Sequence, residues 1–296
     1  MTDPFRCSTG SEERRESLAG TASTVRAFLL IEVPGSWGVD AVRDNRLPHA
    51  VKAELATRAN RHGVRLLMIR KHGRSTPCDT VFAAYADPAN PWLETTCLAG
   101  PADLLDLDLA ALGTGRSPGL MLPHASPLFL VCTHGRHDVC CAERGRPVAA
   151  ALHEIACDNT WEVSHIGGDR FAGNVLVLPE GLYYGRLSAA EAVALAESQK
   201  RGHLDLEHLR GRCGYPFPVQ AAEVFLRGEL DCTALGALTL MARSRRGGQT
   251  EAVFTDGSRS WTVLVDTTER AAEQLTCRAP TSSPSAVHHL RSISSV

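Results

Sequence analysis

The chain has 296 residues, enough for one large domain or two of ordinary size. Its 31 Lys and Arg residues nearly balance 33 Asp and Glu residues, which excludes a nucleic-acid-binding protein that relies on a dense basic surface. The hydrophobic fraction of 44% is sufficient for a core that does not depend on disulfide bonds. None of the ten cysteines forms a Cys-x-x-Cys pair. We therefore expect thiols that fill the core, react or bind a metal.

The first third of the chain predicts a strand, a helix and a second strand. Residues 25–33 and 64–70 are apolar, β-branched runs typical of buried strands. Between them, a helical pattern begins near Pro48 and ends at Gly63, which suits a C-terminal cap. This β-α-β order favours an α/β fold with parallel strands, and residues 81–85 are a candidate third strand.

A similar pattern begins again after residues 123–127. The elements expected there are, in chain order, a strand at 128–131, a polar loop at 132–145, a helix at 147–157, a strand at 161–163, a loop at 164–174, a hairpin of 175–178 and 182–185, and a helix up to 200. A Ser188-x-x-Glu191 capping box opens that last helix. The order β-α-β-β-β-α is thioredoxin-like in outline.

The expected organisation is an α/β protein: a thioredoxin-like fold with an additional N-terminal β-α-β segment and a small C-terminal β-hairpin region. We predict four parts: an N-terminal α/β segment at 1–124, the thioredoxin-like domain at 125–235, a β-rich segment at 236–278 and a disordered tail at 279–296. The tail is inferred from its Pro, Ser and Thr content.

The chain carries no sequence signal for export or membrane insertion. Charged residues at 12–16 stand where a signal peptide would need an apolar region. The longest apolar run, residues 27–33, is far shorter than the roughly 20 residues of a membrane-spanning helix. We expect a cytoplasmic protein with no membrane partner.

Two loops concentrate side chains that bind metals, residues 132–141 and residues 165–169. Each follows a predicted strand, and the ends of parallel strands share one sheet edge, so the two loops should converge. Thiolates, imidazoles and carboxylates suit iron or zinc. The plainer interpretation treats Cys132 as a small core residue and His134 and His137 as solvated loop residues.

Several motifs resemble the sucrase/ferredoxin-like family, a branch of thioredoxin-like ferredoxins, over most of residues 7–277. They are Cys132-x8-Cys141, His165-x-Gly167-Gly168-x-x-Phe171-Ala172-x-Asn174 and Gly181-x-Tyr183-Tyr184-Gly185-Arg186. The resemblance implies a thioredoxin-like fold that holds a 2Fe-2S cluster, with two cysteines from the first loop and two histidines from the second.

This sequence departs from the family pattern at one ligand, because Asp169 stands where the second histidine is expected. Either Asp169 coordinates through oxygen, or a cysteine or water takes its position, or this branch binds its metal differently. We predict Cys132, Cys141, His165 and Asp169 as the cluster ligands. Cys140 is the competitor for Cys141, since neighbouring cysteine side chains diverge. Two thiolates on one iron and harder ligands on the other should raise the reduction potential above that of an all-cysteine ferredoxin.

The expected function is electron transfer with an unidentified redox protein as partner, and an electron carrier is favoured over an enzyme. One alternative is a mononuclear zinc protein that uses the same four residues. Another is a thiol oxidoreductase, which the absence of a Cys-x-x-Cys motif disfavours. The other cysteines are expected to be structural: Cys7, Cys78, Cys97, Cys157, Cys213, Cys232 and Cys277.

Overall fold

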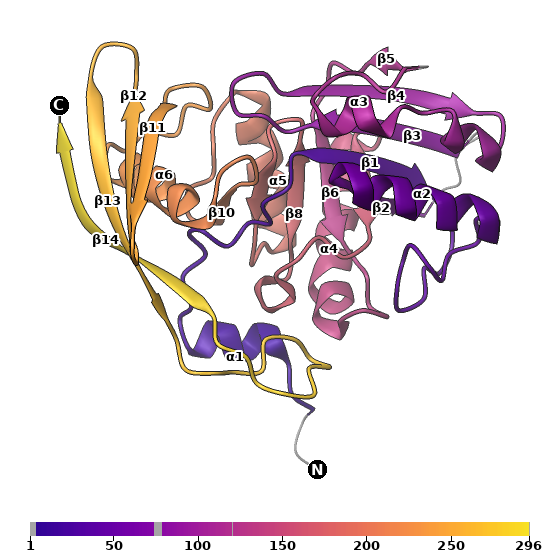
Figure 1. The fold of residues 1–296 in the computed structure, drawn as a ribbon. Coiled ribbons are helices and arrows are strands. Elements are labelled where there is room, and N and C mark those ends of the chain that lie inside the picture. The colour runs from indigo at the N-terminus through magenta and orange to yellow at the C-terminus, as the bar shows by residue number, and fades with distance from the viewer. Residues whose placement is uncertain (1–3, 74–78, 120, 296) are drawn as a thin grey trace.

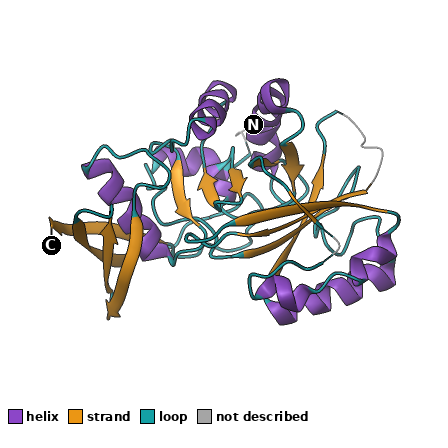
Figure 2. Ribbon diagram, turned by 90° about the horizontal axis from the view of Figure 1, so that it is seen from above, coloured by secondary structure: helices purple, strands orange, loops and turns teal. Residues whose placement is uncertain are grey.

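The computed structural model describes residues 4–73, 79–119 and 121–295, and it contains two β-sheets (Figure 1). The larger sheet has ten strands in the order β10-β9-β8-β6-β7-β2-β1-β3-β4-β5, and helices cover both of its faces (Figure 2). The smaller sheet has four antiparallel strands in the order β11-β12-β13-β14. The α/β class is thus confirmed, with a mixed rather than purely parallel sheet.

The elements of the first half have the following bounds: α1 Cys7–Glu13, β1 Ala27–Glu32, α2 His49–His62, β2 Val64–Arg70, β3 Asp79–Tyr85, β4 Trp92–Leu98, a 3-10 helix η1 Pro101–Leu105, α3 Leu109–Gly113 and β5 Leu122–Pro123. Those of the second half are β6 Leu128–Cys132, α4 Val139–Ala156, β7 Thr160–Val163, a 3-10 helix η2 Asp169–Phe171, β8 Val175–Leu178, β9 Leu182–Tyr184, α5 Ala189–Lys200, β10 Leu209–Arg212, α6 Phe217–Glu229, β11 Thr239–Arg246, β12 Gln249–Thr255, β13 Ser260–Glu269 and β14 Ala286–Ser295.

The same topology occurs twice in the large sheet. In the first half β1 is parallel to β2 and antiparallel to β3, which pairs with β4. In the second half β6 is parallel to β7 and antiparallel to β8, which pairs with β9. The two halves join edge to edge where β2 and β7 pair, and Arg70 and Glu162 form an ion pair of 2.6 Å there.

The two halves also share a hydrophobic core. Alternate side chains of a strand point to opposite faces of its sheet, so β1 divides its residues between two cores. Leu29 and Ile31 pack with the helices of the first half, whereas Phe28 and Leu30 join residues of β6, β7 and β8. Cys132 and Cys141 lie in this shared core, so the predicted ligands sit where the two halves meet.

Local sequence signals place many elements correctly. Gly63 adopts φ 66° and caps α2, and Ser188 and Glu191 form the capping box of α5. The helix expected at 147–157 begins earlier, at Val139, because the side chain of Asp138 accepts a hydrogen bond from the backbone of Cys140 and caps α4 there.

The tail expected to be disordered from residue 279 is instead partly ordered. Residues 286–295 form β14, which pairs with β13 along nearly its whole length. Pro280, Thr281 and Pro284 precede this strand, and pairing with a long neighbouring strand satisfies its backbone groups. The C-terminal strand therefore completes the small sheet.

Eight cysteines of the described residues are free thiols, but Cys97 is disulfide-bonded, contrary to the expectation of thiols throughout. Cys78 lies outside the described residues. Cys157, expected in the core, is exposed because it follows the end of α4. Within the described ranges, no helix is long and apolar enough to cross a membrane.

Candidate metal centre

The two ligand loops leave the same edge of the large sheet. Strands β6 and β7 are parallel neighbours, and Cys132 at the end of β6 pairs with Val163 at the end of β7. The loops that follow them therefore start side by side, as expected for parallel strands. Cys140 and Cys141 lie on the first turn of α4 rather than on the loop, so a rigid helix positions both thiols.

The structure brings together the four residues that the sequence singles out. The thiol of Cys141 donates to Oδ1 of Asp169 at 3.2 Å, and Nδ1 of His165 lies 2.9 Å from the same oxygen. Cys132 and Cys141 are hydrogen-bonded to each other. Both cysteines are 1% exposed and Asp169 is 3% exposed, so two sulfurs and a carboxylate share a dry site.

The site polarises its thiols unequally. The hydrogen bond with Cys141 lowers the pKa of Cys132 and raises the pKa of Cys141, so Cys132 loses its proton first. Burial raises the pKa of Asp169, but the close approach of His137 and His165 outweighs burial, and the net shift is downward. The carboxyl group is therefore ionised at neutral pH and presents a charged oxygen to the two thiols.

His137 completes the site, and the sequence interpretation missed it. Its Nε2 lies 3.5 Å from Oδ2 of Asp169, and its ring centroid is 3.9 Å from that of His165. One ligand atom from each of His137, His165 and Asp169 fits within 4.8 Å of the other two, which makes the trio a possible metal-binding group. The signal was present in the sequence, because His137 lies between Cys132 and Cys141.

His134 also differs from the expectation of a solvated loop residue, since it is 3% exposed. Its Nδ1 accepts a hydrogen bond from the backbone N–H of His165 at 3.3 Å, and its Nε2 lies 2.9 Å from the carbonyl oxygen of Gly38. Burial lowers the pKa of His134. A neutral His134 ring satisfies both contacts, because Nδ1 then accepts from His165 and Nε2 donates to Gly38. His134 therefore positions the second ligand loop.

The atoms of the site fit a metal centre. Nδ1 of His165 is buried and makes no hydrogen bond of acceptable geometry, despite its closeness to Asp169. A buried polar nitrogen without a partner is costly, and coordination to a metal would satisfy it. Two thiols, an imidazole and a carboxylate form a donor set that suits iron or zinc.

The second ligand loop is fixed through its backbone. Four consecutive carbonyl oxygens, those of residues 165–168, each accept a hydrogen bond from a different side chain: from Arg65 at 2.9 Å, Ser23 at 2.8 Å, Arg210 at 2.9 Å and Asn174 at 2.8 Å. Gly168 adopts φ 80°, and a Cβ there would lie 2.2 Å from the guanidinium of Arg210. The loop can take this path because the position is a glycine.

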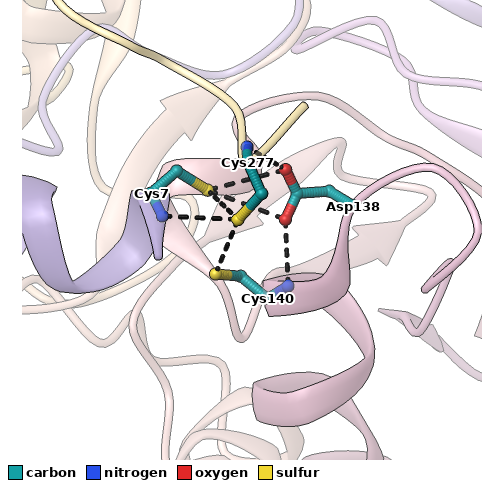
Figure 3. Close-up of side chains that lie close together, drawn as sticks. All are labelled: Cys7, Asp138, Cys140 and Cys277. Atoms are coloured by element: carbon teal, nitrogen blue, oxygen red, sulfur yellow. Dashed lines mark hydrogen bonds between the residues drawn. The ribbon is translucent and has the colours of Figure 1, made fainter. Parts of the chain in front are cut away.

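A second group of possible metal ligands lies beside the first. It comprises Cys7, Asp138, Cys140 and Cys277, which each offer one atom within 4.8 Å of the others (Figure 3). Cys140 therefore faces away from Cys141 and belongs to a different group. Hydrogen bonds, that from Cys7 above all, lower the pKa of Cys140 to about 5. Cys7 and Cys277, expected to be isolated structural residues, are thus brought together.

Comparisons with known proteins identify one family. The model of the sucrase/ferredoxin-like family matches residues 18–211, which include Cys132, Cys141, His165 and Asp169. The chain is also 27% identical over 95 residues to a protein of Meyerozyma guilliermondii named "Altered inheritance of mitochondria protein 32".

That match covers 28% of this chain and 34% of the relative, so the chain spans about a third of the relative's length. No solved structure matches the chain. Because the family match covers more than half of its residues, the chain belongs to the sucrase/ferredoxin-like family.

Proposed function

We propose that this protein transfers electrons through a 2Fe-2S cluster held between the two ligand loops. The observation that carries the proposal is the convergence of two buried thiols, a buried carboxylate and an unbonded imidazole nitrogen at one sheet edge. Membership of the sucrase/ferredoxin-like family supports it. Such a cluster, when bound, supplies a one-electron redox couple.

Cys132 and Cys141 would bind one iron, and His165 and Asp169 the other. The two thiols contact each other in the shared core, where water is excluded. His165 offers its unbonded Nδ1, and Asp169 lies between His165 and Cys141. His137 faces the second oxygen of Asp169 and would hold the carboxylate in place, as outer hydrogen bonds commonly do at metal sites.

The surrounding fold suits this role. We propose a thioredoxin-like domain around β6, α4, β7, β8, β9 and α5, and the strand order β9-β8-β6-β7 supports it. His137 and His165 are about one-third exposed and line a cavity of about 390 Å³ together with His134. A redox partner would approach from this side, because the cysteines are buried and the histidines reach the surface.

Iron and acid-labile sulfide content after anaerobic purification tests the proposal. We expect about two iron and two sulfide atoms per chain, with visible absorption that is lost in Cys132→Ala. Cys157→Ser is the matched control, because Cys157 is a free and exposed thiol, and it should keep the full iron content. A colourless protein without iron would overturn the cluster, and zinc that is lost in Cys132→Ala would favour mononuclear zinc at these residues.

The fourth ligand can be tested separately. Asp169→His introduces the residue expected in this family pattern and removes a negative charge, so the variant should keep its iron and show a higher reduction potential. Asp169→Ala should lose iron, whereas His137→Gln should keep it. Retention of iron in Asp169→Ala together with its loss in His137→Gln would show that His137 is the ligand.

A further inference from the structure

Three distant parts of the chain meet at the group formed by Cys7, Asp138, Cys140 and Cys277. Cys7 begins α1, Asp138 and Cys140 form the N-terminus of α4, and Cys277 lies between β13 and β14. Figure 3 shows all four side chains directed at a common point. Cys7, Asp138 and Cys140 are each 0% exposed, and Cys277 is partly buried.

The four ligand atoms of the group all lie within 4.8 Å of one another, close to the spacing in a tetrahedral site. Sγ of Cys277 lies 3.3 Å from Sγ of Cys140 and 3.5 Å from Sγ of Cys7. Sγ of Cys7 lies 3.6 Å and 3.7 Å from the two carboxylate oxygens of Asp138. A tetrahedral zinc site with Zn–S bonds of about 2.3 Å places its sulfurs about 3.8 Å apart. Ligand atoms this close leave room for one ion and not for a cluster of several.

The electrostatics of the group favour a bound cation. Asp138 is fully buried, and no basic side chain among the described residues forms an ion pair with it. Its oxygens accept hydrogen bonds from the backbone of Cys140 at 2.9 Å and of Cys277 at 2.6 Å. Capping of α4 explains the first of these bonds, but it does not explain why three thiols surround a buried carboxylate. A divalent cation would compensate this charge.

The group also has the outer hydrogen bonds that stabilise thiolate ligands. The backbone N–H of Cys7 donates to Sγ of Cys277 at 3.4 Å, and the hydroxyl of Ser8 donates to Sγ of Cys140 at 3.3 Å. A disulfide is the competing explanation for the close sulfurs. It would join only two of the three cysteines and would leave the third thiol beside an uncompensated carboxylate.

We propose that Cys7, Asp138, Cys140 and Cys277 bind a structural Zn²⁺ ion that fastens both ends of the chain to the N-terminus of α4. Four protein ligands form a closed tetrahedral site with no position for a substrate, and binding releases the thiol protons. The ion holds α1 and the segment around Cys277 against the helix that also carries Cys141. This site is separate from the proposed iron centre and uses none of its ligands.

Metal analysis of three variants separates the two sites. Cys132→Ala should lose iron and keep about one zinc per chain, whereas Cys277→Ser should lose zinc and keep iron. Cys232→Ser is the matched control, since Cys232 is a free thiol outside both groups, and it should keep both metals. Zinc is also compared between Cys132→Ala and the double variant Cys132→Ala/Cys277→Ser, so that any zinc bound by the remaining residues of the proposed iron site contributes equally to both measurements.

Two further measurements keep the proposal open to refutation if Cys277→Ser fails to fold. Co²⁺ loaded into Cys132→Ala should give the visible and near-ultraviolet absorption of tetrahedral thiolate coordination. Peptide mass spectrometry without reduction should find all three cysteines as thiols. Less than a tenth of a zinc per chain after loading, octahedral cobalt spectra, or a disulfide within the group would each overturn the site.

Discussion

Gly145→Ala should disturb the proposed iron centre without replacing any of its ligands. Gly145 lies on α4, four residues after Cys141 and therefore on the same face of the helix. A Cβ at this position would lie 2.1 Å from the carbonyl oxygen of Cys132 and 3.1 Å from its carbonyl carbon. Backbone atoms occupy that space, so α4 has to retreat from the end of β6 by about 1 Å.

The expected cost follows from two opposing terms. Forcing a methyl group into a packed contact costs about 1–3 kcal/mol, whereas replacing glycine by alanine within a helix stabilises by about 1 kcal/mol. We expect the free energy of unfolding to fall by about 0–2 kcal/mol. The retreat also separates Cys141 from Cys132, so iron content should fall much more than this modest change in stability suggests.

Urea unfolding of the reduced apoprotein and iron content of the purified protein measure the two effects. Gly228→Ala is the matched control, because Gly228 also lies in a helix and a Cβ there has no atom within 4 Å. It should stabilise the protein by about 0.5–1 kcal/mol and leave iron content unchanged. If Gly145→Ala proves as stable as the control variant and retains full iron content, the close packing of α4 on Cys132 does not position the ligands.

Three further substitutions test contacts elsewhere in the fold. Arg210→Met removes a fully buried guanidinium and leaves the carbonyl oxygen of Gly167 and Oδ1 of Asn174 without this donor. We therefore expect a loss of about 3 kcal/mol in urea unfolding and reduced iron content, and unchanged values would contradict its positioning role. Burial raises the pKa of Glu223, but Arg212 and Arg227 outweigh burial and lower it. The Glu223 carboxylate therefore takes up a proton more readily in the unfolded state, and the free energy of unfolding should fall as pH drops below about 4.3. Glu223→Gln should be less stable at neutral pH, and its stability should depend less on pH in acid. A pH dependence identical to that of the unsubstituted protein would refute the stabilising role of the ionised Glu223. Ser188→Ala removes the N-cap of α5 and should cost about 1 kcal/mol in thermal or urea unfolding, with no change in iron content.

The elements that sequence reasoning placed correctly are those whose signals are local. The strand at Val64–Arg70 has the predicted bounds because Gly63 ends the preceding helix and an apolar run follows it directly. The capping box of α5 is likewise contained in four residues. The joining of the two halves into one sheet was not predicted, because pairing between β2 and β7 depends on two residue pairs far apart in sequence.

The start of α4 shows how one strong signal can hide another. Pro147 suits the first turn of a helix, which led to a predicted start at that residue. In the structure Pro147 lies within α4, and Asp138 provides the N-cap nine residues earlier. The consequence is functional, because the correct start places Cys140 and Cys141 on a helix rather than on a flexible loop.

The candidate iron ligands could be found from sequence because the members of each pair lie close together in the chain, just after one of two neighbouring parallel strands. The second group could not be found in this way. Cys7 and Cys277 are separated by 270 residues, and neither has a ligand-like neighbour in sequence at metal-binding spacing. Only the folded chain, with α1 and the segment around Cys277 packed on α4, brings their sulfurs within 3.5 Å.

The adjacent cysteines of α4 link the two groups mechanically. Successive side chains on a helix are about 100° apart, so Cys140 and Cys141 point to different sides of the same turn. Cys141 contacts Asp169 in the shared core, whereas Cys140 contacts Cys277 at the outer group. Any change that moves the first turn of α4 therefore displaces a ligand in both groups. An ion bound by the outer group would therefore stabilise the turn that also carries Cys141, while the contact between Cys141 and Asp169 keeps that thiol in the shared core when the ion is absent.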